Sequence, residues 1–422
     1  MARISSAPGP QQERLAAYLD SLAQAAGHAD RIGPLKSYCT GLLLPGERKS
    51  VEPMAARLAP DNVRRVHQSL HHVVADAPWS DEAVLGQVRS RVLPAMKEHG
   101  AVVAWIVDDT GFPKKGTHSV GVTRQYCGQL GKQENCRVAV SLSVATWNSS
   151  VPIAYRLYLP ESWAEDPERR KQAGVPEEAR FQTKPQIALE QIRQAVEAGV
   201  AAGVVLADAA YGTDSEFRRG LTEFGLAYVV GVQSSMSVWE PGAEPLPPKR
   251  GKGKGRPATL LRRDQKQQPV SVKQLALAVP SSAWNDVAWS EGTERRLRSR
   301  FAALRVRPAH RDHEKAEPTK YWVSTLPPQT KLKALVKIAK HRWIIERDHE
   351  ELKQELGLGH YEGRGWRGFH HHATLCIAAY GFLVAERNRF PASARAGRLE
   401  LCAPEIPPDF QPRGSPPAGR AA

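Results

Sequence analysis

Cysteine is scarce in this sequence and never closely spaced. The chain has five cysteines in 422 residues, and no two of them form a Cys-x-x-Cys motif. Structural zinc sites and disulfide frameworks both depend on clustered cysteines. The sequence therefore indicates neither, and isolated cysteines fit a reducing cytosol.

Long apolar stretches are also missing. No run of about 18 apolar residues occurs in the chain, although a membrane-spanning helix requires one. The first residues lack the charged start, apolar segment and cleavage site of a signal peptide. We therefore expect no membrane insertion and a cytoplasmic location.

Acidic residues are outnumbered by basic ones. Lys and Arg total 59 against 44 Asp and Glu, which gives a net charge of +15 and a pI near 9.7. Such a surplus favours a polyanionic partner, through long-range attraction and through counterion release from phosphates. With 41% hydrophobic residues the chain can bury a sizeable core, and its length predicts two or three domains.

Two apolar segments each run into an aspartate. Residues 101–107 lead into Asp108 and Asp109, and residues 204–207 lead into Asp208. Short apolar runs bounded by turn residues are typical of strands buried on both faces of an α/β sheet. An acid that ends such a strand lies at a sheet edge where ligands bind, although a single aspartate there is often only a helix cap or turn residue.

The segment 341–353, HRWIIERDHEELK, predicts a helix with charges on one face. Arg342, Glu346, Glu350 and Lys353 follow one another at offsets of four, four and three. Such a stripe can be an ordinary salt-bridged surface. Together with the two aspartates it also supplies a third carboxylate, and three carboxylates can hold two Mg²⁺ ions for in-line attack on a phosphodiester.

Strand and helix patterns follow in the order expected of an RNase H-like core. The expected elements are strands at 101–108, 117–127, 137–147 and 152–158, a helix at 184–199 and a strand at 203–208. The chain between Asp208 and Glu346 is too long for an ordinary connection, and strand-like pieces at 270–279 and 319–327 predict an insertion there. We therefore expect an α/β fold: an RNase H-like mixed-sheet catalytic core with an inserted β-rich subdomain and a helical N-terminal domain.

Composition sets the expected domain boundaries. These are a disordered start (1–12), a helical and DNA-binding domain (13–99), the first part of the core (100–232), a basic β-rich insertion (233–330), the second part of the core with the acidic helix (331–395) and a disordered tail (396–422). A helical bundle with a basic solvated face is the alternative for 13–99. The histidines at 71–72 and 370–372 lack metal-ligand spacing and are interpreted as packing or phosphate contacts.

Three motifs, IVDDTGFPKKG, LADAAYG and HRWIIERDHEELK, resemble in this order those of bacterial insertion-sequence transposases of the DDE class. The chain is most similar to the cut-and-paste group whose catalytic helix carries a YREK signature. The tyrosine position of that signature is Ala339 here, which leaves one DNA contact unassigned. The resemblance implies Mg²⁺-dependent cleavage of element ends and strand transfer into target DNA by a two-metal mechanism.

The resemblance also implies roles for individual residues. Asp108, Asp208 and Glu346 would be the catalytic metal ligands: Asp108 and Glu346 hold one Mg²⁺, Asp208 bridges two, and Mn²⁺ can substitute. Asp109 is the alternative to Asp108, and Glu350 is the alternative to Glu346.

The expected partner is double-stranded DNA, as terminal repeats and as target, bound by a homodimer in the bacterial nucleoid. By the resemblance, Arg342 and Lys353 would clamp phosphates and Trp322 would stack on a flipped base, although a strand tryptophan is often core. Charge alone adds further candidates for DNA contacts, namely Lys114, Lys115, Arg124, Lys249, Arg250, Lys252, Lys254 and Arg256. The alternatives are a nuclease or resolvase without strand transfer, and a domesticated transposase that acts as a DNA-binding protein.

Overall fold

A computed structural model describes most of the chain. The described residues are 9–240, 242–243, 245–247, 263–265, 268–280, 282, 285–291, 295–301, 307–308 and 320–390. The tail expected at 396–422, most of the start expected at 1–12 and the basic loop 249–256 lie outside these residues. The chain forms two units: unit one comprises 1–102, 109–183 and 345–422, and unit two comprises 103–108 and 184–344.

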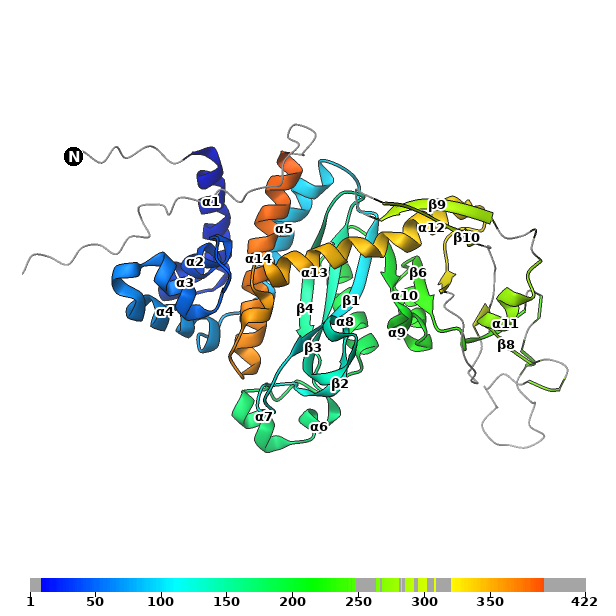
Figure 1. The fold of residues 1–422 in the computed structure, drawn as a ribbon, viewed down its shortest axis with the longest axis horizontal. Coiled ribbons are helices and arrows are strands. Elements are labelled where there is room, and N and C mark those ends of the chain that lie inside the picture. The colour runs from blue at the N-terminus through cyan, green and yellow to red at the C-terminus, as the bar shows by residue number, and fades with distance from the viewer. Residues whose placement is uncertain are drawn as a thin grey trace, which may run out of the picture. The chain divides into compact units, whose positions relative to one another are not determined.

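Unit one begins with helices, as the sequence predicts. They are α1 (Pro10–Ala25), α2 (Ala29–Leu43), α3 (Val51–Leu58), α4 (Val63–Ala75) and α5 (Asp81–Lys97). The first begins at Pro10, inside the segment expected to be disordered, because the Gly9 amide donates to Gln12 Oε1 at 2.9 Å and Pro10 suits the first helical position. A long helix, α14 (Trp366–Arg389), runs beside α5 (Figure 1). Gly381 permits this approach, since a Cβ there would lie 3.0 Å from Val92 Cγ2.

The strands of unit one form an antiparallel group around β3. They are β2 (Thr123–Cys127), β3 (Lys132–Ala145) and β4 (Ser150–Leu157), and both β2 and β4 pair with β3. The strand expected at 117–127 begins only at Thr123, because a turn with Gly121 at φ 72° precedes it. β4 packs against α14 and α5, and β3 beside it is buried from Cys136 to Ala145, so this packing forms part of the core of unit one (Figure 1).

β1 (Ala104–Pro113) contributes residues to both units. It was expected to end at Asp108, but it continues through both aspartates because Thr110, Gly111 and Phe112 are buried and extend the strand. Gly111 is required there, since a Cβ would lie 2.9 Å from Cys127 Sγ. The strand order is β12-β6-β5-β1 in unit two and continues as β1-β3-β2 in unit one.

Unit two contains the parallel part of the sheet. β5 (Val204–Ala207) lies between β1 and β6 (Tyr228–Val232), parallel to both, and β12 (Tyr321–Ser324) pairs antiparallel with β6. The helices α8 (Lys184–Glu197), α9 (Ala209–Gly212) and α10 (Ser215–Glu223) flank β5 in sequence. The mixed α/β sheet is confirmed. The strand expected at 319–327 was assigned to the insertion, but as β12 it joins this sheet.

In the described part of the insertion, the structure has short strands and one α-helix. Its elements are β7 (Ser237–Trp239), β8 (Val270–Ser271), α11 (Val272–Leu277), β9 (Asn285–Glu291), β10 (Arg295–Phe301) and β11 (Arg307–Pro308). The segment 270–279 was expected to be a strand, but most of it is α11. Ser271 and Gln274 form a capping box that starts this helix. No helix among the described residues is long and apolar enough to cross a membrane.

Candidate functional site

Asp108 lies on β1, and Asp208 directly follows β5, the neighbouring parallel strand. The register pairs Ala104 with Val204 and Ile106 with Leu206. Asp108 and Asp208 each lie two residues beyond the last pair of this register. Both residues are half-buried. The two predicted aspartates therefore belong to adjacent elements of unit two.

Asp208 is fixed in place by its own backbone turn. It is the N-cap of α9, and its Oδ1 accepts a hydrogen bond from Ala210 N at 2.9 Å. A Cβ on Gly231 would lie 3.0 Å from Ala209 N, and one on Gly212 would lie 2.0 Å from the Gly231 oxygen. These glycines let α9 pack directly on β6. The cap bond uses Oδ1 of the carboxylate, and Oδ2 is outside that bond.

Asp108 is paired with a cation from another part of unit two. Arg342 Nη1 donates to Asp108 Oδ2 at 2.9 Å, and the side chains are 27% and 17% exposed. Asp109 points to the opposite face of β1, since successive strand residues alternate. Burial raises the pKa of Tyr155 well above its usual value, and the Asp109 carboxylate is one of the smaller contributions in the same direction.

The segment 341–353 is not one continuous α-helix. α12 (Leu332–Lys340) is followed by a 3₁₀ turn (His341–Trp343), and α13 (Ile344–Gln354) begins after it. Arg342 therefore lies in the turn and reaches Asp108, whereas the sequence predicted that it shares one helical stripe with Glu346. Glu346 and Glu350 lie on α13, in unit one, and both are exposed.

Asp348, between these two glutamates, is a buried residue that the sequence analysis missed. It accepts hydrogen bonds from Ser150 Oγ (2.5 Å) and Tyr380 OH (2.7 Å), and burial raises its pKa to about 7. Its spacing with the buried Ile345 and Leu352 could have revealed it, because offsets of three and four mark one helical face. Asp348 thus anchors α13 to β4 and α14.

Lys353 contacts β1 and the hairpin between β2 and β3. Its Nζ donates to the Gly111 oxygen at 3.1 Å and to Gln129 Oε1 at 3.3 Å. The same ammonium lies 5.2 Å from the centre of the Phe112 ring. The last residue of the predicted stripe therefore holds α13 against neighbouring elements of unit one.

The other predicted DNA contacts fall into two groups. Lys115 and Arg124 are exposed. Lys114 is half-buried and donates to the Tyr361 oxygen at 2.9 Å, and burial lowers its pKa to about 8. Trp322 is half-buried in β12 opposite Gly231, with Lys340 Nζ 5.8 Å from its ring. The residues Lys249, Arg250, Lys252, Lys254 and Arg256 lie outside the described part of the chain.

The histidines of α14 are packing residues. His370, His371 and His372 are all buried, and the ring of His371 stacks on Trp79 with centroids 3.6 Å apart. His71 and His72 are exposed on α4, next to Asp76. The packing interpretation is therefore confirmed for the three histidines of α14.

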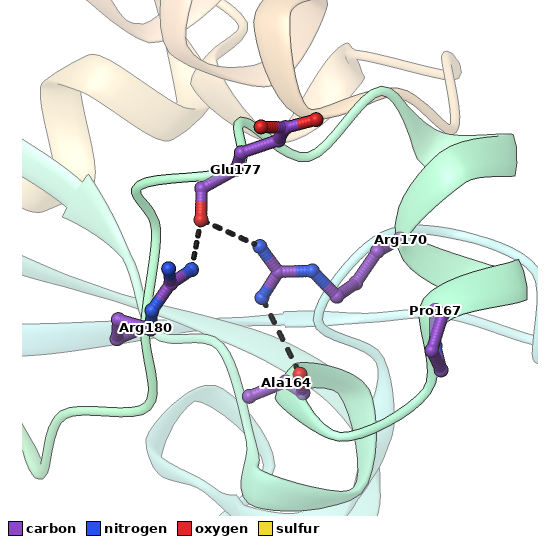
Figure 2. A pocket seen from close by; sticks show the side chains of 5 residues that line it. All are labelled: Ala164, Pro167, Arg170, Glu177 and Arg180. Carbon is purple, nitrogen blue, oxygen red and sulfur yellow. Dashed lines mark hydrogen bonds between the residues drawn. The ribbon is translucent and has the colours of Figure 1, made fainter.

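A pocket in unit one lies apart from these residues. It is lined by Ala164, Pro167, Arg170, Glu177 and Arg180, and Figure 2 shows the Arg170 guanidinium directed at backbone oxygens. Arg170 donates to Ala164 O at 3.3 Å and to Glu177 O at 3.4 Å. The arginine therefore holds the loop after α7 (Pro167–Ala173) closed, and the pocket contains none of the predicted site residues.

The carboxylates of Asp108 and Asp208 are suitable ligands for a hard divalent cation. Mg²⁺ prefers carboxylate and other oxygen ligands, and it is commonly bound through one or two carboxylates. Among the residues that the structure describes, no group of three or more His, Cys, Asp or Glu is arranged to hold a metal ion. Asp108 and Asp208 carry oxygen donors of the kind that such a cation prefers.

Two comparisons with known proteins match this sequence. A family model described as DDE superfamily endonuclease matches residues 21–296, a range that contains both aspartates. The probable transposase for insertion sequence element IS701 from Microchaete diplosiphon is 32% identical over 193 residues, which are 46% of this chain and 46% of that protein. The matched part therefore spans about half the length of this curated relative.

Proposed function

This chain belongs to the DDE superfamily of endonucleases, and on that premise we propose that it is an insertion-sequence transposase. It would cut the ends of its DNA element and join them to target DNA. The observation that carries the proposal is the placement of Asp108 on β1 and of Asp208 directly after β5, two strands that pair in parallel. Two half-buried carboxylates at neighbouring strands are poorly explained by packing, because each costs free energy to desolvate.

The catalytic acids in this proposal are Asp108, Asp208 and Glu346, within a core of RNase H type. When bound by these acids, two Mg²⁺ ions would activate a water or 3′-hydroxyl for attack and stabilise the leaving 3′ oxygen. Asp208 would hold its carboxylate in a fixed direction through the α9 cap. Arg342 would orient the Asp108 carboxylate before DNA arrives.

DNA handling in this proposal uses basic residues around the acids. Arg342 and Lys353 would contact phosphates near the reacting bond, and Trp322 would stack on a displaced base. The loop 249–256 would follow the phosphate backbone. Cutting both ends of one element would require two copies of the chain assembled on DNA.

One reaction tests the proposal. The full chain is incubated with Mg²⁺ and a duplex that carries the repeats flanking its own gene, and the products are separated on denaturing gels. Nicked and joined products are expected, and a chelator should abolish both. Nicks without joined products would indicate a nuclease, and binding without any nick would indicate a domesticated DNA-binding protein.

The aspartates provide a matched pair of variants for that reaction. Asp108→Asn should abolish cleavage, because the amide no longer supplies a charged metal ligand. Asp109→Asn alters the next residue of the same strand, on its other face, and should retain cleavage. The reverse result would move the site to Asp109.

A further inference from the structure

Tyr126 is an unusually exposed aromatic residue on a strand. Its side chain is 61% exposed on β2, and Arg124, two residues earlier, is also exposed. Residues two apart on a strand share a face, so ring and guanidinium point the same way. The opposite face packs in a cluster of Cys127, Cys136 and Val138. The outer face therefore presents an aromatic ring and a cation on a backbone fixed from behind.

A second cation is held beside this face by Asn135. In the hairpin register Asn135 lies opposite Arg124. Its Nδ2 donates to the oxygens of Lys114 (2.6 Å) and Gly116 (2.9 Å), which pins the exposed Lys115 between them. Glu134 belongs to the other face, opposite Gln125, and Lys132 neutralises it at 3.3 Å. The face of Tyr126 is therefore positively charged.

The turn of the same hairpin is joined to the helix that carries Glu346. Gln129 lies in the turn between β2 and β3, and its Oε1 accepts from Lys353 Nζ at 3.3 Å. Lys353 is two helical turns beyond Glu346 on α13. A ligand on the outer face of the hairpin would therefore lie next to α13 within unit one.

We propose that the outer face of the β2–β3 hairpin binds DNA beside the reacting end, with Tyr126 stacked on an unpaired base and Arg124 and Lys115 on the flanking phosphates. This inference rests on the proposed function. A base inside a duplex is covered on both faces by its neighbours, so an exposed ring stacks on a base whose face is uncovered, as an unpaired base is. Nucleic acid is the partner that combines π-faces with regularly spaced negative charge.

The test uses two DNA probes that contain no cleavable element end. One is a fully paired duplex, and the other has a single-stranded extension with 2-aminopurine, whose fluorescence is quenched by stacking. Full-length protein is titrated without Mg²⁺ so that binding is measured apart from cleavage. Tyr126→Leu should lose the quenching and bind the extended probe about 5- to 100-fold more weakly, with unchanged affinity for the paired duplex. Tyr126→Phe should behave as the wild type.

Phe390→Leu is the matched control, because Phe390 is 65% exposed with the Arg14 guanidinium 5.2 Å from its ring. It should leave quenching and affinity unchanged. Arg124→Gln and Lys115→Gln should weaken binding to both probes and each reduce the salt slope by about one, without removing the quenching. Retained quenching in Tyr126→Leu, or equal loss in Tyr126→Phe, would overturn the stacking role. Wild-type protein that binds neither probe would overturn the hairpin face as a DNA-binding surface, whereas the proposed function is decided separately by the cleavage reaction on element ends.

Discussion

Arg342 donates a hydrogen bond to Asp108 over 2.9 Å, and thereby places a fixed positive charge beside one of two aligned aspartates. The two residues are 234 positions apart in the sequence, and the contact depends on the 3₁₀ turn that separates α12 from α13. Charge-assisted bonds of this kind are stronger than neutral ones. The arginine therefore orients Asp108, and it also opposes any second cation that approaches the same carboxylate.

Replacing Arg342 should thus change the affinity for metal and the affinity for DNA in opposite directions. In Arg342→Gln we expect Mn²⁺ to bind the DNA-free protein about three- to tenfold more tightly, because a nearby positive charge is removed. DNA should bind more weakly through the loss of a phosphate contact. Mn²⁺ titration followed by electron paramagnetic resonance measures the first effect. Arg347→Gln, which removes an exposed arginine paired with Glu351, should leave Mn²⁺ binding unchanged. Unchanged or weaker Mn²⁺ binding in Arg342→Gln would contradict the electrostatic argument.

The two roles of Asp208 can be separated by two substitutions. Asp208→Asn keeps an oxygen to cap α9 and removes the charge, so it should unfold at the wild-type temperature and lose cleavage. Asp208→Ala should lose cleavage and also about 1 kcal/mol of stability, because the cap to Ala210 N is lost. Thermal unfolding and the cleavage reaction measure the two effects.

Asp214 provides the control for the cap. It caps α10, and its Oδ1 accepts from Phe217 N at 3.0 Å. Asp214→Ala should therefore lose a similar stability and retain cleavage. Cleavage by Asp208→Asn would leave only the structural role for Asp208.

Two substitutions on α13 test whether Glu346 or Glu350 is the third catalytic acid. Both side chains are exposed on α13, one turn apart, so Glu346→Gln and Glu350→Gln should be equally harmless to folding. We expect the first to abolish Mg²⁺-dependent cleavage and the second to retain most of it. Binding of an uncut end should survive in both. Loss of cleavage in Glu350→Gln alone would transfer the third acid to Glu350.

Local patterns predicted the elements that carry the two aspartates, because a short apolar run followed by an acid indicates a buried strand from a few residues alone. They did not predict that β1 continues past Asp108. Thr110 and Gly111 read as a turn, and the reason for Gly111 is its contact with Cys127 on another strand. The pairing of β12 with β6 likewise joins residues about 90 positions apart, for which neither segment holds a local signal.

Two other differences between the expected and the observed structure could have been predicted from the sequence. The Ser271–Gln274 capping box is visible in the sequence and outweighs the strand-like composition of 270–279. Asp348 lies among charged residues, so composition suggests surface, whereas its spacing with Ile345 and Leu352 marks the buried face. The 3₁₀ turn at 341–343 is different, because helical periodicity alone does not distinguish it from a continuous helix.

Acid should destabilise the fold through the buried histidines of α14. Burial lowers the pKa of both His371 and His372 to about 4. The unfolded chain takes up these protons near pH 6.5, whereas the folded chain resists them until about pH 4. The stabilisation is therefore complete above about pH 6.5 and is lost as the pH falls towards 4, by roughly 3 kcal/mol for each histidine at the lower limit.

His372→Gln tests whether protonation of His372 lowers the stability of the fold as the pH falls. His372 Nε2 donates to Gly357 O at 2.9 Å, so its Nδ1 accepts from Tyr38 OH at 2.8 Å, and glutamine can keep a donor and an acceptor without titrating. Urea unfolding between about pH 7 and pH 4 should show a lower stability at neutral pH and a shallower loss on acidification than in the wild type. His99→Gln replaces an exposed histidine and should leave the slope unchanged. A slope in His372→Gln as steep as that of the wild type would show that His372 is not a source of the acid sensitivity.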